Sequence, residues 1–189
     1  FVLAPALAAE RGLVGFGVVA FGPDLAISNL DVAVVFAFAM LALGVWALVL
    51  GAWASRNRYA ILGGLRAAAQ MLAYEAFLGL SAMGVVMLAG GFSMGAVVAA
   101  QEGAWFILLQ PLGAILFFIA SIGAAHRLPL DLPESENDIV AGFMTEYSGM
   151  SFALFFLGEY LAIILVAALA ATLFFGGWLG PWLPGPVWF

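Results

Sequence analysis

The sequence has 189 residues, of which 66% are hydrophobic and only 8% are charged, and its mean hydropathy is +1.17. Soluble domains usually carry about 25% charged residues, so this composition excludes a water-soluble globular protein and indicates an all-α polytopic membrane protein. The chain has no cysteine and one histidine, which excludes disulfides, thiolate chemistry and multi-histidine haem or metal sites formed by this chain alone. Any redox centre would therefore belong to other subunits.

Five apolar runs are long enough to cross a bilayer core of about 30 Å as helices. They cover residues 1–22, 33–53, 68–90, 104–125 and 150–175. The chain begins "FVLAPALAAE" and ends "PGPVWF", so both ends lie in apolar sequence. We expect one membrane domain over residues 1–189, incomplete at both ends, as an internal piece of a longer protein.

The first run carries Glu10 and Arg11 near its middle. Adjacent residues point about 100° apart on a helix, so these two side chains do not simply pair with each other. We expect a charge pair at a protein contact, or a first segment that is bent or only partly spanning, because exposure of these charges to lipid is costly.

The third run contains an acid at Glu75, preceded by a polar stripe. Arg66, Gln70 and Tyr74 are spaced four residues apart and share one helix face. The alternative for Arg66 is a side chain that only reaches towards the membrane surface. In the fourth run, Gln110-Pro111 predicts a kink.

The fifth run contains a second acid, Glu159. Measured from the expected helix starts, Glu75 would lie about 10 Å and Glu159 about 13 Å into the membrane. Acids at this depth are candidates for function by default, and two at similar depth can share a polar cavity and exchange protons. The alternative is a neutral carboxylic acid that makes a hydrogen bond between helices.

An acidic loop at residues 126–149 separates the fourth and fifth runs, and it holds five of the eleven carboxylates. Arginines occur only in the connection between the second and third runs, in this loop, and at Arg11. The positive-inside rule therefore places both connections in the cytoplasm and residues 91–103 on the opposite side.

The loop and its flanks resemble one family closely. "HRLPLDLPESENDIVAGFMTEYSGMSFALFFLGEY" is similar to the signature of the H subunit of bacterial proton-pumping NADH–quinone oxidoreductase, respiratory complex I. "WASRNRYAILGGLRAAAQMLAYE" and "TLFFGGW" resemble two further blocks of that family. Departures from the pattern include Leu130 for phenylalanine, Asp138 for glutamate and Ala73 for serine.

The resemblance implies that the chain corresponds to helices two to six of an eight-helix subunit in the bacterial inner membrane. It implies that the chain lines a quinone-reduction chamber and couples quinone chemistry to proton movement. Quinone would be a substrate shared with partner subunits, the other membrane subunits and the soluble iron–sulfur arm would be partners, and the chain would not be active alone. The resemblance gives a proton relay to Glu75, Glu136, Glu146 and Glu159. The chamber residues that it implies are Arg66, Tyr74, Arg127, Asp131, Glu134, Asp138 and Tyr147.

Two other functions fit part of the pattern. A homologous membrane subunit of an energy-converting hydrogenase or ferredoxin-linked complex keeps similar acids but usually binds no quinone. A passive membrane anchor or a secondary transporter is the other alternative, although no internal repeat typical of transporters is visible. For Asp131 and Glu134 the alternative is docking of the soluble arm, and for Tyr147 it is an aromatic anchor at the membrane surface.

Overall fold

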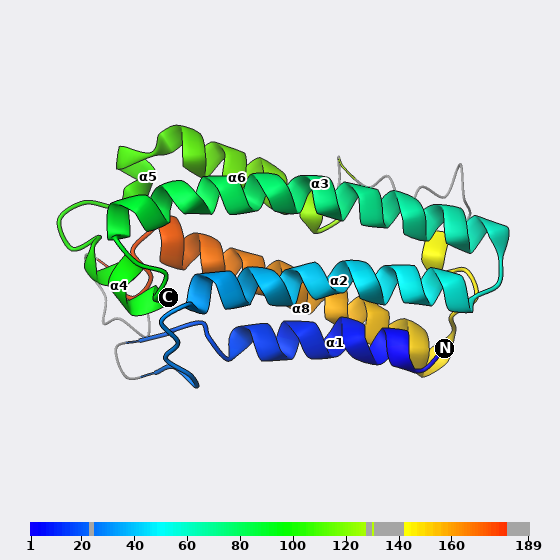
Figure 1. The fold of residues 1–189 in the computed structure, drawn as a ribbon. Helices are drawn as coiled ribbons and strands as arrows, with labels where there is room; N and C mark the ends of the chain where they lie inside the picture. The colour runs from blue at the N-terminus through cyan, green and yellow to red at the C-terminus, as the bar shows by residue number, and fades with distance from the viewer. Residues whose placement is uncertain (23–24, 128–129, 131–141, 181–189) are drawn as a thin grey trace.

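The structure is a computed structural model that describes residues 1–22, 25–127, 130 and 142–180. Its long helices run side by side along one axis (Figure 1). Within the described ranges there is no strand, so the predicted all-α fold is confirmed. The elements are α1 (Leu3–Phe16), α2 (Ala33–Ala54), α3 (Arg58–Ala89), α4 (Met94–Ala99), α5 (Phe106–Leu109), α6 (Pro111–Ala124), the 3-10 turn η1 (Gly142–Met144) and α8 (Gly149–Phe174).

Three helices are long and apolar enough to cross a membrane: α2 with 22 residues, α3 with 32 and α8 with 26. The full-length helix predicted at 1–22 is wrong in extent, whereas the run predicted at 104–125 is helical from Phe106 to Ala124 with a break at Gln110. α1 has only 14 residues, because the chain turns after Phe16 and the Gly17 carbonyl accepts a bond from the Ser28 N–H. The alternative of a partly spanning first segment therefore describes α1 better.

The kink predicted at Gln110-Pro111 is present as a break between two helices. α5 ends at Leu109 and α6 begins with Pro111 in its first turn, where proline's missing N–H costs nothing. The Gln110 side chain donates from Nε2 to the Gly84 carbonyl of α3 at 2.7 Å. This bond ties the break to the neighbouring helix.

The start of the third helix differs from the prediction by ten residues, since α3 begins at Arg58 rather than at residue 68. The Asn57 side chain caps this end by accepting from the Tyr59 N–H at 3.0 Å, and no proline interrupts the helix that follows. Glu75 therefore lies about 26 Å along its helix, while Glu159 lies about 15 Å along α8. The predicted distance of Glu75 from its helix start is thus wrong, because α3 begins ten residues earlier, but both acids still interact with Arg11.

Four helix pairs make most of the contacts: α1 with α8, α1 with α2, α2 with α3, and α3 with α6. The α1–α8 contact is close because Gly158 has no side chain, and a Cβ there would overlap the Ala8 carbonyl. Ridges of small residues let helix backbones approach in this way within membranes. The result is that α1 and α8, far apart in sequence, form one wall of the bundle.

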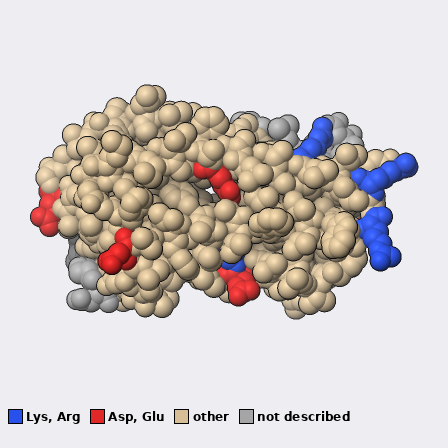
Figure 2. Space-filling view, viewed as in Figure 1, with Lys and Arg blue, Asp and Glu red and all other residues tan. Residues whose placement is uncertain are grey.

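The two ends of the bundle are distinct. Asn57 donates to Glu146 at 2.8 Å, so the α2–α3 connection and the segment before α8 lie at the same end. Gln101 donates to the Thr172 carbonyl at 3.0 Å and joins the other end. Figure 2 shows basic side chains gathered at the end where α2 passes into α3. The α2–α3 connection and the segment before α8 thus lie at one end, as the arginine pattern requires, whereas Arg127 itself lies beside Glu159 part-way along α8.

Candidate functional site

An ion pair joins the segment after α6 to the middle of α8. Arg127 Nη2 lies 3.2 Å from Glu159 Oε1, and the Glu159 side chain is only 11% exposed. The guanidinium also lies over the Tyr160 ring, 4.9 Å from its centroid. A charge in an apolar bundle is costly unless it is paired, so this pair explains how α8 accommodates an acid.

A second arginine reaches the same region from α1. Arg11 is 9% exposed, and its Nη1 donates to the Leu41 carbonyl of α2 at 3.1 Å. The guanidinium lies in a recess at Gly44, where a Cβ would overlap it. Arg11 interacts electrostatically with both Glu75 and Glu159. Arg11 therefore faces protein, as expected for a charge at a protein contact, whereas the Glu10 side chain is exposed.

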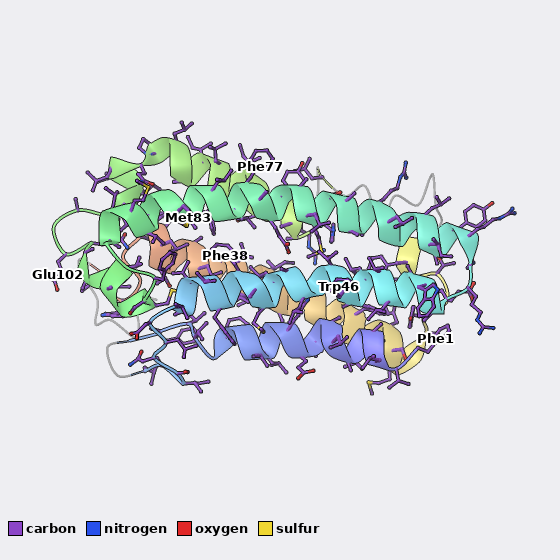
Figure 3. All side chains as sticks on the ribbon, in the orientation of Figure 1. Phe1, Phe38, Trp46, Phe77, Met83 and Glu102 are labelled. Atoms are coloured by element: carbon purple, nitrogen blue, oxygen red, sulfur yellow. The ribbon has the colours of Figure 1, made fainter. Side chains whose placement is uncertain are left out.

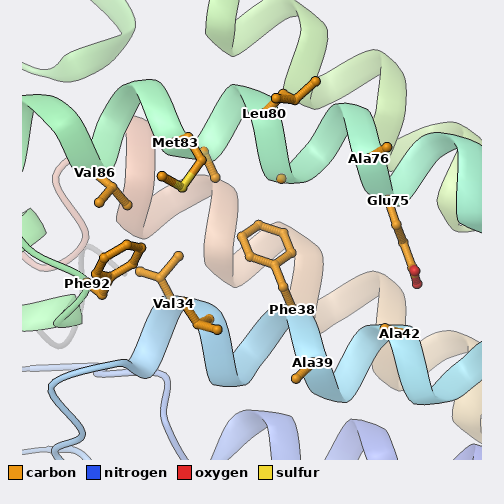
Figure 4. Close-up of a pocket in the computed structure, with 13 residues that line it drawn as sticks. Val34, Phe38, Ala39, Ala42, Glu75, Ala76, Leu80, Met83, Val86 and Phe92 are labelled. Atoms are coloured by element: carbon orange, nitrogen blue, oxygen red, sulfur yellow. The ribbon is translucent and has the colours of Figure 1, made fainter.

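Glu75 lies at one end of an open apolar groove of about 510 Å³ between α2 and α3. Its carboxylate points from α3 towards α2 near Ala42 (Figure 4). Glu75 Oε1 is buried and has no hydrogen-bond partner among the described residues. The carboxylate thus sits between two helices at the border of this groove, rather than projecting away from the bundle.

His126 lies in the turn after α6 and is 7% exposed. It has a φ of 49°, in the left-handed region that residues other than glycine seldom adopt. Burial lowers the pKa of His126 to about 4, against a hydrogen bond to the Ala67 backbone that raises it, and the charges of Arg11 and Arg127 lower it further. The ring is therefore neutral near pH 7. Nothing local in the sequence indicates this burial, so His126 is not among the site residues predicted above.

The predicted polar stripe on α3 faces α6 and the segment that follows it. Gln70 Nε2 donates to the Gly123 carbonyl at 2.8 Å and to the Leu130 carbonyl at 2.6 Å. The Tyr74 ring packs directly on Gly123. Arg66, one turn before Gln70, is exposed. The stripe holds the chain after α6 against α3, and so fixes the start of the Arg127 segment.

The remaining predicted residues lie elsewhere. Glu146 is exposed and bonds Asn57 at the end of the bundle. Tyr147 is buried there, with its hydroxyl donating to the Gly51 carbonyl at 3.0 Å, and burial raises the pKa of this hydroxyl. Asp131, Glu134, Glu136 and Asp138 lie outside the described residues. The structure therefore brings together Glu75, Glu159 and Arg127, but leaves Glu146 and Tyr147 at the end of the bundle where α2 passes into α3.

The carboxyl groups of this arrangement can bind and release protons. Among the residues that the structure describes, no cluster of three or more His, Cys, Asp or Glu side chains is placed to hold a metal ion. The arginines keep their protons, whereas each carboxyl group can exist in two protonation states. The net charge of this buried network changes when either acid takes up a proton. In apolar surroundings the dielectric constant is low, so this change alters the electrostatic energy of nearby charges strongly.

Comparison with known proteins identifies the family. The sequence model of the family described as NADH dehydrogenase matches residues 1–189. The chain is 78% identical over 188 residues to the second H subunit of NADH-quinone oxidoreductase from Cereibacter sphaeroides, an alignment that covers 99% of this chain and 59% of the relative. It is 70% identical to the second H subunit from Rhodopseudomonas palustris over 189 residues, again 59% of the relative. It is 50% identical to the H subunit from Methylococcus capsulatus over 190 residues, which is 60% of that protein.

The chain thus spans about three fifths of the length of these relatives. The match confirms the resemblance drawn from the three sequence blocks. A membrane protein is also what the apolar helices indicate. Because the family model covers the whole chain, this protein belongs to the NADH dehydrogenase family, which includes the H subunits of the NADH-quinone oxidoreductases.

Proposed function

We propose that this chain is part of the membrane-embedded H subunit of a proton-translocating NADH–quinone oxidoreductase in a bacterial inner membrane. In this role it lines the quinone-reduction chamber and couples quinone reduction to proton movement through its carboxylates. Its partners are the other membrane subunits of the complex and the soluble iron–sulfur arm. The chain supplies a part of the enzyme and has no activity alone.

The observation that carries this proposal is the group of charges inside the bundle. Arg11 comes from α1, Glu75 from α3, Arg127 from the segment after α6 and Glu159 from α8. Four segments each contribute a charge to one region, although burial of charge does not by itself stabilise a fold. Burial of several charges in a membrane costs free energy, which favours a functional role for them. Carboxylates within membranes commonly take part in proton transfer.

The proposal also gives a role to Glu146 and Tyr147, which lie at the end of the bundle where α2 passes into α3. Reduction of a quinone by two electrons takes up two protons, so a route for protons has to reach the chamber. Glu146 and Tyr147 sit at the arginine-rich end, where the acidic loop rejoins the bundle. The proposal assigns four acids of the loop to this route: Asp131, Glu134, Glu136 and Asp138. Arg66 and Tyr74, on the stripe that holds the loop's first residues, line the chamber with Arg127.

The names of the relatives favour this function over a hydrogenase or a ferredoxin-linked complex, since those names specify quinone as the acceptor. A passive anchor has no need for buried acids. An apolar quinone tail would find suitable surfaces on the bundle, such as the groove between α6 and α8. That groove has a volume of about 220 Å³ and includes Arg127 among its lining residues.

The test is Glu159→Gln in the intact complex. Glutamine keeps the size and hydrogen bonding of glutamate but cannot titrate. We expect normal assembly, with quinone-linked turnover and proton pumping lowered together by about tenfold or more, since loss of a positioned proton-transfer group commonly has an effect of this size or larger. Glu136→Gln should lower both activities less, because a loop position offers other routes for protons.

The matched control is Glu102→Gln. Glu102 is exposed at the end of the molecule opposite Phe1 (Figure 3), far from the proposed route, so this variant should pump normally. Arg127→Gln separates proton transfer from anchoring. If Glu159 only holds Arg127 in place, the two variants will have equal effects and both will reduce assembly. Full turnover and pumping in the Glu159→Gln complex would end the proton-relay proposal.

A further inference from the structure

A small, partly open cavity lies beside the charge group and outside the groove and stripe described above. Its volume is about 20 Å³, which is room for one water molecule and little more. It is bounded by α1, α2, α8, the turn after α6 and η1. The lining residues are Ala8, Arg11, Ala47, Leu48, His126, Phe143, Met144, Phe155 and Glu159.

Three of the lining side chains are polar, and they come from three different segments of the chain. His126 Nε2 is buried and has no hydrogen-bond partner among the described residues. The imidazole is neutral and contacts the Ala67 backbone, so one ring nitrogen is available as an acceptor. A buried acceptor left without a donor is rare in folded proteins and calls for an explanation.

Arg11 and Glu159 supply the complementary groups. Arg11 has five N–H donors, and two of them bond the Ala8 and Leu41 carbonyls among the described residues. Glu159 offers two oxygens with several acceptor positions, and Arg127 approaches one of these oxygens. Donors and acceptors therefore surround the cavity, while its remaining walls are apolar.

We propose that this cavity binds one water molecule, which accepts a hydrogen bond from Arg11 and donates to His126 Nε2 and to the Glu159 carboxylate. Three bonds are the usual number for a buried water. The site satisfies the orphaned imidazole nitrogen without moving any helix. It also gives Arg11 a role, since its side chain lines the cavity and supplies the donor that orients the water.

The water would give Glu159 a neighbour with which it can exchange protons. Two of the groups that interact with this acid are Arg11 and Arg127, which do not release protons. A bound water, with His126 behind it, is then a neighbour of Glu159 that can take or give a proton. The water site goes beyond the proposed function and can be detected whether or not the complex pumps protons.

The test is a map of the intact complex at a resolution that shows internal waters, for the wild type and for Ala47→Val. In the wild type we expect one density peak about 2.7–3.2 Å from both His126 Nε2 and a Glu159 oxygen. Ala47 is fully buried on α2 and lines the cavity, so the two added methyl groups fill the space. The density should disappear in this variant, with the Arg127–Glu159 pair unchanged.

The matched control is Ala39→Val, which makes the same change at a less buried position of the same helix, away from the cavity, and should keep the water. Should Ala47→Val prevent assembly, Ala8→Val fills the cavity from α1 instead. A wild-type map with no density here, at a resolution that shows other internal waters, would overturn the inference. So would density that persists in a filled-cavity variant. Water in the map of a complex that pumps normally with Glu159→Gln would keep this site and refute only the proposed function.

Discussion

Gly44→Ala tests how the bundle holds a buried arginine. Gly44 lies on α2 against the Arg11 guanidinium, and a Cβ built there overlaps Nη1. The overlapped atom is the far end of a flexible side chain, so the guanidinium can move aside while the helix backbones stay in place. In moving, Arg11 loses the bond from Nη1 to the Leu41 carbonyl, which is 3.1 Å long.

The size of the effect follows from two opposing contributions. A hydrogen bond from a charged group contributes about 1.5–3 kcal/mol to the free energy of unfolding. Replacing glycine by alanine inside a helix raises the free energy of unfolding by about 0.5–1 kcal/mol, because alanine loses less conformational entropy on folding. The net loss is about 1–2 kcal/mol, and for a chain of this size each kcal/mol lowers the unfolding temperature by about 2–4 °C. We therefore expect a decrease of about 2–8 °C for Gly44→Ala.

The measurement is the temperature at which half of a fluorescently tagged chain remains soluble after heating in detergent. Gly79→Ala is the matched control, because a Cβ at Gly79 on α3 meets no atom within 4 Å. This control should be neutral or slightly stabilising. In an Arg11→Leu background, Gly44→Ala should cost much less, since no charged group is displaced. Equal losses in both backgrounds would refute the account of the recess.

The remaining predictions concern topology, pH and the far end of the bundle. In the cysteine-free chain, single cysteines replacing Asn57 and Asn137 should be labelled from the cytoplasm, and one replacing Ser93 from the other side; labelling of the first two from opposite faces would overturn the layout. The pKa of His126 is about 4 in the folded chain against an ordinary value of 6.5. On acidification the imidazole of the unfolded chain therefore takes up a proton at a higher pH than that of the folded chain. The unfolding temperature should therefore fall as pH drops from 6.5 towards 4, and His126→Asn, which tolerates the positive φ, should flatten this dependence; an unchanged slope would contradict the assignment. Gln101 is 2% exposed and bonds α4 to α8, so Gln101→Leu should lower the free energy of unfolding by about 1–3 kcal/mol, measured by the same heating assay, and no loss would show that its bonds contribute little.

Much of the fold was predictable because it depends on local sequence. Apolar runs of membrane length indicate helices, since backbone groups in lipid have to bond within their own segment. Pro111 marks the break in the fourth helix for an equally local reason. The family is also readable from short contiguous blocks, and the match over residues 1–189 confirms it. Helix ends were less predictable: α3 continues back to Arg58, since arginine is a good helix former and Asn57 provides the cap.

The charge group is what the tertiary structure decided. The sequence alone shows that Glu75 and Glu159 are acids in apolar runs, and that Arg11 and Arg127 are cations whose partners it does not specify. Which acid meets which cation depends on how α1 packs against α2 and α8, and therefore on glycines that let these helices approach. The buried histidine becomes part of the site only because the turn after α6 folds inward. Composition and periodicity act over a few residues and determine helices, whereas a polar site inside a bundle is made by side chains from distant parts of the chain.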